Sequence, residues 1–408
     1  MKNSSKSSDT DLCVMCGMCL PNCPTYQLYQ SETESPRGRI ALIQAINQQQ
    51  IKADATALLH IDHCLSCLNC ETICPSKVPY GKIIDDFRNQ FNSSIKKSYL
   101  SRAILKQSTK PNGLETLFHI ANKPVIKQIL RLGPSSLKTT ALQTTQNRAE
   151  IKAFYAGSYS AAENRRGEVT LFTGCIGKSS DHDTIKDAVV ILNSLGFDVN
   201  IPPQQYCCGA LHQHNGQQQQ ASQLLKENQL QLEKLKSDFI LFFSPACGEN
   251  LQQLENLAVL DVRSFILSEL QQQHLSFKKP DQPVALHESC SHRNRLKLKT
   301  LNYDLINCVP DVHILDSNNP SLCCGASGIQ SIDYPEQSQA LLQAKLTSFD
   351  FTQTNILISD NIGCSLHMKS SISGYNPNIE IIHPVSFLAR QLNIKNQPDT
   401  EVTHKCDT

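Results

Sequence analysis

"CVMCGMCLPNCP" at residues 13–24 and "CLSCLNCETICP" at residues 64–75 decide the first part of the fold. Both stretches have the spacing C-x2-C-x2-C-x3-C-P. They lie within the first quarter of a chain of 408 residues that holds 18 cysteines. The first part of the chain is therefore expected to be built around two equivalent cysteine loops.

This spacing is that of bacterial two-cluster ferredoxins. Three thiolates with two residues between successive cysteines on a tightly coiled loop can face one [4Fe–4S] cluster. The fourth cysteine, with proline beside it, is expected to begin a helix that leads away, so that it reaches the other cluster. We predict two clusters, the first held by Cys13, Cys16, Cys19 and Cys74, and the second by Cys64, Cys67, Cys70 and Cys23. Zinc also suits C-x2-C pairs, but it explains two full copies of the motif poorly.

A helix is expected between the two motifs. Pro36 can begin it, and apolar residues return at helical spacing at Ile40, Ile43 and Ile46. Arg37 and Arg39 stand at its start. They could raise the potential of a cluster or pair with acidic groups of a partner, or they could be ordinary surface arginines, and the sequence leaves both readings open.

The second half of the chain repeats itself. "VTLFTGC" ends at Cys175 and "VALHESC" at Cys290, and "YCCGA" at 206–210 is matched by "LCCGA" at 322–326. This predicts a duplicated domain with a period of about 115 residues. Each copy reads as α/β, with buried strands at 169–172, 239–243, 284–286 and 356–358, and helices at 183–195 and 219–236.

Cysteines of the repeats follow the predicted strands, and ligands bind at the carboxyl edge of open α/β sheets. Gly209 and Gly325 supply the backbone freedom that lets two adjacent thiols reach one site. The possible metal ligands are Cys175, Cys207, Cys208 and Cys247 in the first repeat, and Cys290, Cys323, Cys324, Cys364 and His367 in the second. An iron–sulfur cluster, zinc, or thiols without metal all remain open.

Other candidates near these motifs are discounted. The histidines close to the cysteines are expected to be loop or capping residues: His212, His214, His287 and His292. Cys308 is expected to be a buried thiol and Cys406 to lie in a polar tail.

The patterns C-x31-CCG-x37-C and C-x32-CCG-x38-C resemble the CCG cysteine-rich domain. That domain occurs in iron–sulfur subunits of heterodisulfide reductases, anaerobic glycerol-3-phosphate dehydrogenases, and glycolate and lactate oxidising complexes. Together with the two ferredoxin motifs and "CPTYQLYQSETESPRGRI" at 23–40, the chain resembles the iron–sulfur subunit of glycolate oxidase. It departs from the full CCG pattern where a further cysteine is expected, because Asn250 and His367 stand there, and of these only the imidazole is a good metal ligand.

The predicted fold class is α+β and multi-domain: a helical two-cluster ferredoxin-like domain followed by two duplicated α/β CCG domains. The boundaries are 1–90 for the ferredoxin-type domain, 91–165 for a basic helical linker, 166–278 and 279–396 for the CCG repeats, and 397–408 for a flexible tail. Residues 88–152 carry 12 Lys and Arg against two acids, which indicates either a docking segment for an anionic surface or a solvated linker.

The resemblance implies an electron-transfer subunit of a flavin-dependent glycolate dehydrogenase, with no catalytic residue of its own. FAD is expected in partner subunits, because this chain has no G-x-G-x-x-G fingerprint. Electrons would pass to a membrane quinone. The alternatives are the iron–sulfur subunit of a lactate or anaerobic glycerol-3-phosphate dehydrogenase, and a CCG-type disulfide reductase.

The composition excludes some classes of partner and compartment. Lys and Arg number 38 against 37 Asp and Glu, so no nucleic-acid partner is expected and a redox sensor that reads DNA is disfavoured. The sequence has no signal-peptide core and no apolar stretch of the ~18 residues that a membrane span needs. We expect a cytoplasmic protein, peripheral to the cytoplasmic face of the inner membrane.

Overall fold

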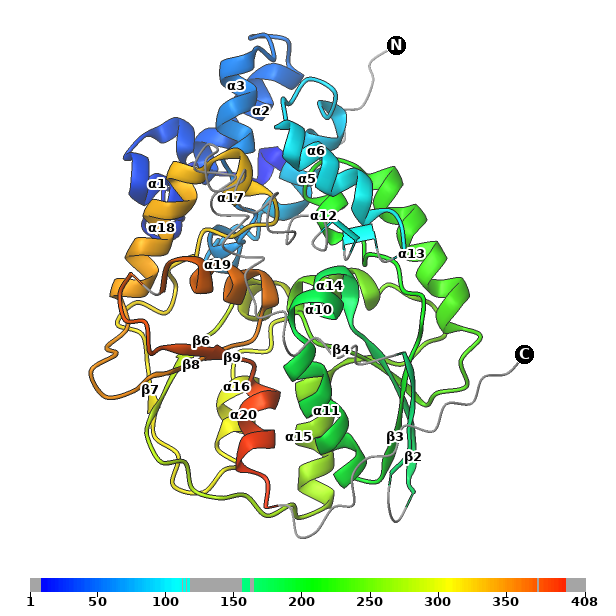
Figure 1. The fold of residues 1–408 in the computed structure, drawn as a ribbon. Coiled ribbons are helices and arrows are strands. Elements are labelled where there is room, and N and C mark those ends of the chain that lie inside the picture. Colours follow the sequence, from blue (N-terminus) through cyan, green and yellow to red (C-terminus); the bar gives the residue numbers. More distant parts are fainter. Residues whose placement is uncertain are drawn as a thin grey trace, which may run out of the picture.

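The structure is a computed structural model that describes residues 9–111, 113–114, 116–117, 156–161, 165–372 and 374–393. Most of the predicted basic linker, the predicted tail at 397–408 and Cys406 lie outside these residues. Figure 1 shows a helical N-terminal part above two sheets that lie beside each other.

The N-terminal part is made of short helices around the two cysteine loops. Its elements are η1 (Asp9–Leu12), η2 (Leu20–Asn22), α1 (Pro24–Tyr29), η3 (Glu32–Glu34), α2 (Pro36–Asn47), α3 (Ala55–Asp62), α4 (Asn69–Thr72), α5 (Tyr80–Gln90) and α6 (Tyr99–Ser108). Helix α2 begins at Pro36 as predicted, and the hydroxyl of Ser35 accepts a hydrogen bond from the Gly38 amide at 2.9 Å to cap it. The isoleucines of α2 are buried in one apolar core with α3 and α5.

The first repeat forms a five-stranded sheet with the order β1-β3-β2-β4-β5. Its elements are β1 (Gly157–Tyr159), β2 (Gly167–Phe172), α10 (Gly174–Ser180), α11 (His182–Ser194), β3 (Phe197–Ile201), α12 (Ala210–Gln213), α13 (Gln218–Leu232), β4 (Phe239–Phe242), α14 (Pro245–Leu251), β5 (Val259–Asp261) and α15 (Val262–Gln272). All neighbouring strands are parallel except β1, which pairs antiparallel with β3.

The second repeat forms a four-stranded parallel sheet with the order β7-β6-β8-β9. Its elements are β6 (Val284–His287), η4 (Ser291–Arg295), α16 (Leu301–Ile306), β7 (Ile314–Leu315), α17 (Gln330–Asp333), α18 (Pro335–Thr347), β8 (Ile356–Ser359), α19 (Ile362–Ile372), β9 (Glu380–Ile382) and α20 (Pro384–Gln391). This order is that of β3-β2-β4-β5 in the first repeat, so the duplication seen in the sequence is also a duplication of topology.

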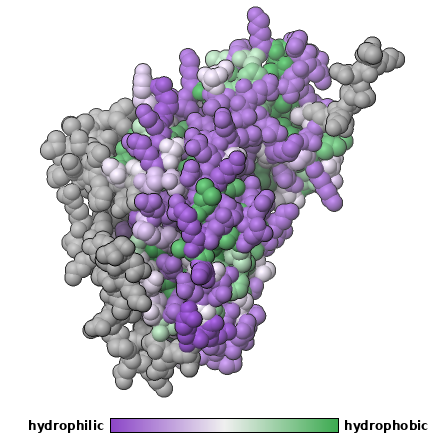
Figure 2. All heavy atoms as spheres, turned by 90° about the vertical axis from the view of Figure 1, so that its right-hand side faces the viewer, coloured by the Kyte–Doolittle hydropathy of each residue, from purple (hydrophilic) through white to green (hydrophobic). Residues whose placement is uncertain are grey.

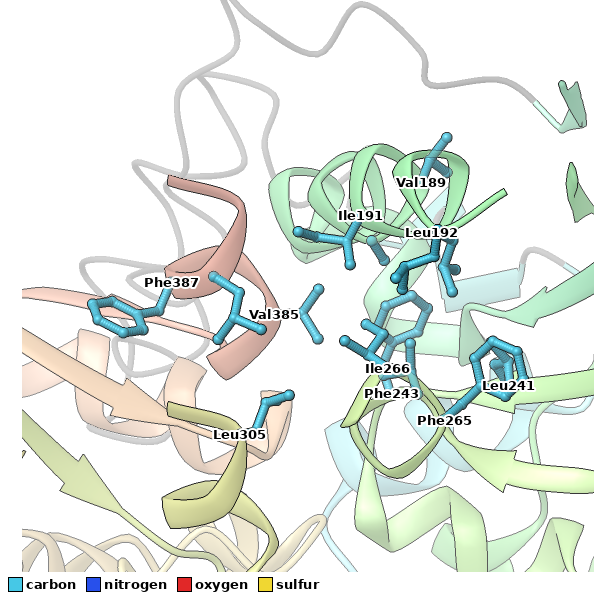
Figure 3. Close-up of a cluster of buried hydrophobic side chains, with 14 of the residues drawn as sticks. Val189, Ile191, Leu192, Leu241, Phe243, Phe265, Ile266, Leu305, Val385 and Phe387 are labelled. Atoms are coloured by element: carbon cyan, nitrogen blue, oxygen red, sulfur yellow. The ribbon is translucent and has the colours of Figure 1, made fainter. Parts of the chain in front are cut away.

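Helices α11, α15, α16 and α20 lie between the two sheets and fill one apolar core (Figure 3). Leu192 of α11, Ile266 of α15 and Val385 of α20 are each buried completely. A single core joins the repeats, and this fixes the position of the carboxyl edge of one sheet relative to the other.

The predicted fold class is confirmed: a helical ferredoxin-type part precedes two α/β repeats. The strands at 157–159, 197–201, 259–261, 314–315 and 380–382 were not predicted. Four of them have only two or three residues, whereas 197–201 alternates apolar and polar residues, which is a pattern typical of a half-buried strand. No helix in the described part of the chain is long and apolar enough to cross a membrane. On the face drawn in Figure 2, hydrophilic residues surround small groups of apolar ones.

Candidate functional site

The two cysteine loops of the N-terminal part have the same backbone conformation. The second residue after the first cysteine has a left-handed backbone in both loops, with φ of 57° at Met15 and 50° at Ser66. The fourth residue does too, with φ of 84° at Gly17 and 58° at Leu68. Left-handed residues reverse the direction of the chain within one step. Placed between the cysteines, they curl each loop so that its thiols lie on the inside.

The eight motif cysteines lie around two small cavities. Cys13, Cys16, Cys19 and Cys74 line one, and Cys23, Cys64, Cys67 and Cys70 line the other. Each cavity thus holds three cysteines of one motif and the fourth of the other. Cys23 caps α1 as expected. Cys74 begins no helix, because it follows α4 and the chain turns before α5 starts at Tyr80.

The two thiol groups differ in exposure. Cys16 is exposed, as are the neighbouring side chains of Val14 (68%) and Met18 (55%). The second group is buried, and burial together with neighbouring thiols raises the pKa of Cys67 and Cys70 well above the ordinary value. Several thiolates buried close together repel one another and lose their hydration, and a bound metal centre offsets this cost with its positive charge. The residues present therefore fit iron–sulfur clusters.

Arg37 and Arg39 have different environments although they are two residues apart on α2. Arg37 is partly exposed, pairs with Glu32 at 2.7 Å and donates to the Met15 carbonyl at 2.8 Å, beside the first thiol group. Arg39 is 1% exposed and lines the cavity of the second group. The reading of Arg39 as a surface arginine is therefore wrong.

A buried polar group around Glu34 was not predicted. Its carboxylate accepts from Arg39 at 2.6 Å and contacts Nδ1 of His60 at 2.6 Å and of His63 at 2.8 Å. Burial alone would raise the pKa of Glu34, but the bonds from His63 and Arg39 hold it below its ordinary value. The glutamate and the histidines stand outside any motif, so only the folded chain brings them together.

Four cysteines of the first repeat form a chain of contacts at the carboxyl edge of its sheet. Cys175 contacts Cys207, Cys207 contacts Cys208, and Cys208 contacts Cys247. Gly209 makes the turn with φ of 89°, as predicted. The backbone of Ala221 lies close to Gly209, so a Cβ at this position would be 2.9 Å from the Ala221 carbonyl oxygen and a side chain does not fit.

The second repeat brings Cys290, Cys323, Cys324 and Cys364 together in the same way. The thiols of Cys324 and Cys364 are 3.0 Å apart. A ring nitrogen of His287 lies within 4.8 Å of both sulfurs, and all three residues are buried. Burial lowers the pKa of His287 to about 3, so its imidazole is neutral. His287 was dismissed as a capping residue from the sequence, and this expectation is wrong.

The residues at the departures from the CCG pattern have partners of their own. The Asn250 amide donates to the Cys208 carbonyl at 3.1 Å. His367 lies outside the His287–Cys324–Cys364 group, and its Nε2 is 3.0 Å from the Ser338 hydroxyl. The structure thus places His287, rather than His367, next to the thiols.

The remaining discounted residues take part in polar contacts. His212 contacts Ser108 at 2.9 Å, His214 contacts Asp85 at 3.4 Å, and Nδ1 of His292 lies 3.2 Å from the Asp360 carboxylate. The Cys308 thiol is half-buried and donates to the Asp304 carbonyl at 3.4 Å.

A buried lysine beside the thiols was also not predicted. Lys345 of α18 is 1% exposed, and its ammonium lies 5.0 Å from the centre of the Phe349 ring. Burial lowers its pKa to about 8, while Cys324 and the neighbouring thiols act in the opposite direction. A buried cation at this place stabilises negative charge on sulfur.

The second repeat touches the second cysteine loop of the N-terminal part. Cys67, Cys323 and Cys290 pack together with Leu65 and Leu341 in one apolar cluster. Hydrogen bonds hold this contact: Asn294 donates to the Cys67 carbonyl at 2.7 Å, and Ser327 to the Leu65 carbonyl at 2.7 Å.

A cavity of about 210 Å³ lies between the two repeats and the second cysteine loop. Cys175, Cys207, Cys208 and Cys247 line it from the first repeat, Cys290 and Cys364 from the second, and Leu65 and Ser66 from the N-terminal part. Thiols of both repeats therefore line one cavity.

Comparison with known domain families agrees with this arrangement. Residues 9–78 match the 4Fe-4S dicluster domain, and residues 169–252 and 284–369 each match the cysteine-rich CCG domain. The chain is an iron–sulfur protein that joins a ferredoxin-type dicluster domain to a CCG repeat.

Over nearly its whole length the chain is similar to iron–sulfur subunits of glycolate oxidase, which confirms the predicted resemblance. It is 28% identical to the probable glycolate oxidase iron-sulfur subunit of Bacillus subtilis, over 92% of each chain. It is 26% identical to the glycolate oxidase iron-sulfur subunit of Escherichia coli, over 91% of this chain and 93% of that one. Lactate utilization protein A 2 of Bacillus cereus is 24% identical over 55% of this chain and 99% of its own. These similarities and the dicluster domain support an electron-transfer role in an oxidoreductase.

Proposed function

We propose that this chain is the electron-transfer subunit of a flavin-dependent glycolate dehydrogenase, and that it relays electrons from FAD-containing subunits toward a membrane quinone. Glycolate is oxidised to glyoxylate in the flavoprotein, and this chain has no catalytic residue for that step. The similarity to glycolate oxidase iron–sulfur subunits supports the choice of substrate.

The row of thiol groups through the molecule carries this proposal. It begins at the surface with Cys16 and continues to Cys70, whose electrostatic neighbours include Cys19 of the first group. From the second group it continues through Cys67, which packs against Cys323 of the second repeat. Redox centres at such neighbouring sites allow electrons to move one at a time through the protein.

The proposed ligands are Cys13, Cys16, Cys19 and Cys74 for the first [4Fe–4S] cluster, and Cys23, Cys64, Cys67 and Cys70 for the second. When bound, each cluster accepts and returns one electron. The chain's own groups tune this chemistry. Donors to sulfur, such as the Ser66 amide at 3.4 Å from the Cys64 thiol and the Tyr80 hydroxyl at 3.6 Å, raise a cluster's potential.

The domain boundaries remain part of the proposal, with ferredoxin-type residues at 1–90 and CCG repeats at 166–278 and 279–396. We further propose that the protein is cytoplasmic and docks peripherally at the inner membrane. Its basic segment contributes fewer charges to docking than its composition indicates. Arg88 is 2% exposed, and Lys97 pairs with the buried Asp62 at 2.8 Å.

The test uses the chain purified anaerobically with the subunits that accompany it. Glycolate, D-lactate or glycerol 3-phosphate is added separately, and the EPR signal of reduced clusters is recorded. Reduction by glycolate alone is expected. Reduction by lactate or glycerol 3-phosphate instead would keep the relay but assign it to another dehydrogenase. No reduction with clusters and flavoprotein present would refute the relay and favour the disulfide reductase alternative.

Cys16→Ser tests the route within the protein. Loss of this exposed ligand is expected to remove the first cluster and reduce electron flow to a quinone analogue at least tenfold, while glycolate still bleaches the flavin. Cys308→Ser is the matched control, because Cys308 lies outside both motifs, and it is expected to leave electron flow unchanged. Wild-type electron flow in Cys16→Ser would contradict the proposed route.

A further inference from the structure

The two repeats differ at one buried position beside their thiols. The last residue of β2 is Phe172, and the last residue of β6, at the same place in the repeat, is His287. Phe172 is 1% exposed and packs in an apolar cluster with Cys207 and Cys208. His287 is 2% exposed, so a buried polar ring occupies the place of an apolar one. A buried polar ring requires partners, and the partners indicate its role.

One side of the His287 ring has an ordinary partner, because Nδ1 is 3.0 Å from the Ser359 hydroxyl. A ring nitrogen and the thiols of Cys324 and Cys364 lie within 4.8 Å of one another. Histidine ligands of metals commonly use one nitrogen for the metal and hold the other by a hydrogen bond to a neighbouring group. With Nδ1 held by Ser359, Nε2 is the nitrogen left for a metal.

The other thiols of the repeat extend this group. Cys323 contacts both Cys290 and Cys324, so the four thiols and the imidazole form one cluster of soft and borderline ligands. Such a set suits iron or zinc and does not suit Ca²⁺ or Mg²⁺. At the corresponding place the first repeat has Phe172, whose side chain cannot ligate a metal.

We propose that the second repeat binds a metal centre with His287 as a ligand together with Cys290, Cys323, Cys324 and Cys364, and that the first repeat has no histidine-ligated counterpart. We assign iron to this centre. The choice of iron over zinc rests on the proposed function, since the site packs against Cys67 and zinc carries no electrons. The ligand assignment does not depend on the proposed function.

The experiment uses the full chain with its co-purifying subunits, labelled with ¹⁵N-histidine, purified anaerobically and reduced with dithionite. Pulsed EPR detects a histidine nitrogen that is bound to a paramagnetic iron centre. A strong ¹⁵N coupling is expected in the wild type and in His367→Phe. It is expected to disappear in His287→Phe, which introduces the residue of the first repeat. Iron per chain is expected to fall in His287→Phe toward the about eight atoms of the two [4Fe–4S] clusters.

Ser359→Ala is a second variant that tests the site without removing the histidine, so the test does not depend on the folding of His287→Phe. It keeps the histidine but removes the partner of Nδ1, so the coupling is expected to change in size without loss of iron. A coupling that survives in His287→Phe, or that disappears in His367→Phe, would overturn the assignment. A coupling unchanged in Ser359→Ala would overturn the orientation of the ring.

Metal analysis of the same samples separates the remaining outcomes. Zinc that is present in the wild type and lost in His287→Phe would keep the ligand assignment but overturn the choice of iron. About eight irons per chain and no other metal would overturn the site itself. Glycolate-dependent reduction of the two [4Fe–4S] clusters can be recorded independently, so failure of this site and failure of the proposed function are distinguishable.

Discussion

Replacing Arg39 with methionine removes a buried cation that links three segments of the N-terminal part. The guanidinium donates to the Glu34 carboxylate at 2.6 Å and the Glu34 carbonyl at 2.8 Å. It also donates to the Thr25 hydroxyl at 3.0 Å and the His60 carbonyl at 2.6 Å. Methionine fills a similar volume but donates no hydrogen bond, so all four acceptors lose the hydrogen bond from Arg39, although the Glu34 carbonyl still accepts from the Thr25 hydroxyl at 2.8 Å.

The expected cost follows from these contacts. Breaking a buried ion pair by removing one partner costs about 3–5 kcal/mol, because the other charge stays buried. Here Glu34 keeps its contacts with Nδ1 of His60 and Nδ1 of His63, and these contacts offset part of the loss. We therefore expect about 3 kcal/mol. If this interaction forms only after the folding transition state, the cost appears in the unfolding rate, which increases about 100-fold.

Arg37→Met is the matched control on the same helix. The Arg37–Glu32 pair is 29% and 50% exposed, and exposed pairs contribute about 0–1 kcal/mol, or at most a fivefold change in rate. The assay is the anaerobic decay of cluster absorbance in guanidinium chloride, since cluster loss makes unfolding irreversible. Arg39→Lys keeps the charge but not the planar guanidinium, so its decay rate is expected to fall between those of the wild type and Arg39→Met. Equal decay rates for Arg39→Met and Arg37→Met would refute the reasoning.

Two further predictions concern the repeats. Gly209→Val places a branched side chain at φ of 89° and a Cβ 2.9 Å from the Ala221 carbonyl oxygen, so it is expected to destabilise the fold by about 2 kcal/mol and to speed the decay of cluster absorbance in guanidinium chloride about 30-fold. Gly177→Ala, with nothing within 4 Å of its Cβ, is the control, and equal decay rates of the two variants would contradict this. Burial lowers the pKa of His383 from 6.5 to about 4, so the unfolded chain binds a proton between these pH values that the folded chain excludes, and stability falls as pH falls through this window. From pH 7 to 5.5 the loss is about 1 kcal/mol, which corresponds to an about fivefold faster decay of cluster absorbance in guanidinium chloride. His383→Asn, which can still cap α20, should lack this effect, and the same pH dependence of the decay rate in both proteins would count against it.

Local sequence patterns predicted the parts of the fold that depend on neighbours along the chain. The C-x2-C-x2-C spacing indicated the two loops, because cysteines with two residues between them on a curled backbone can share one centre. Pro36 and the isoleucines after it indicated α2, and the apolar runs after residue 168 indicated β2, β4, β6 and β8. Strands β5, β7 and β9 were not predicted, because segments of two or three residues are too short to show a periodic pattern.

The sequence by itself determined which cysteines belong to a motif, that the second half is duplicated, and which family the chain resembles. Only the tertiary structure decided which groups lie beside the cysteines. Arg39 is buried and donates to the carbonyl of His60 on α3, Glu34 contacts His60 and His63, and Cys67 packs against Cys323 of the second repeat. His287 and His367 both stand near motif cysteines in the sequence. In the structure, His287 at the end of β6 lies beside the thiols of Cys324 and Cys364, whereas His367 contacts the Ser338 hydroxyl. These outcomes depend on contacts between residues far apart in the chain, and no local pattern records such contacts.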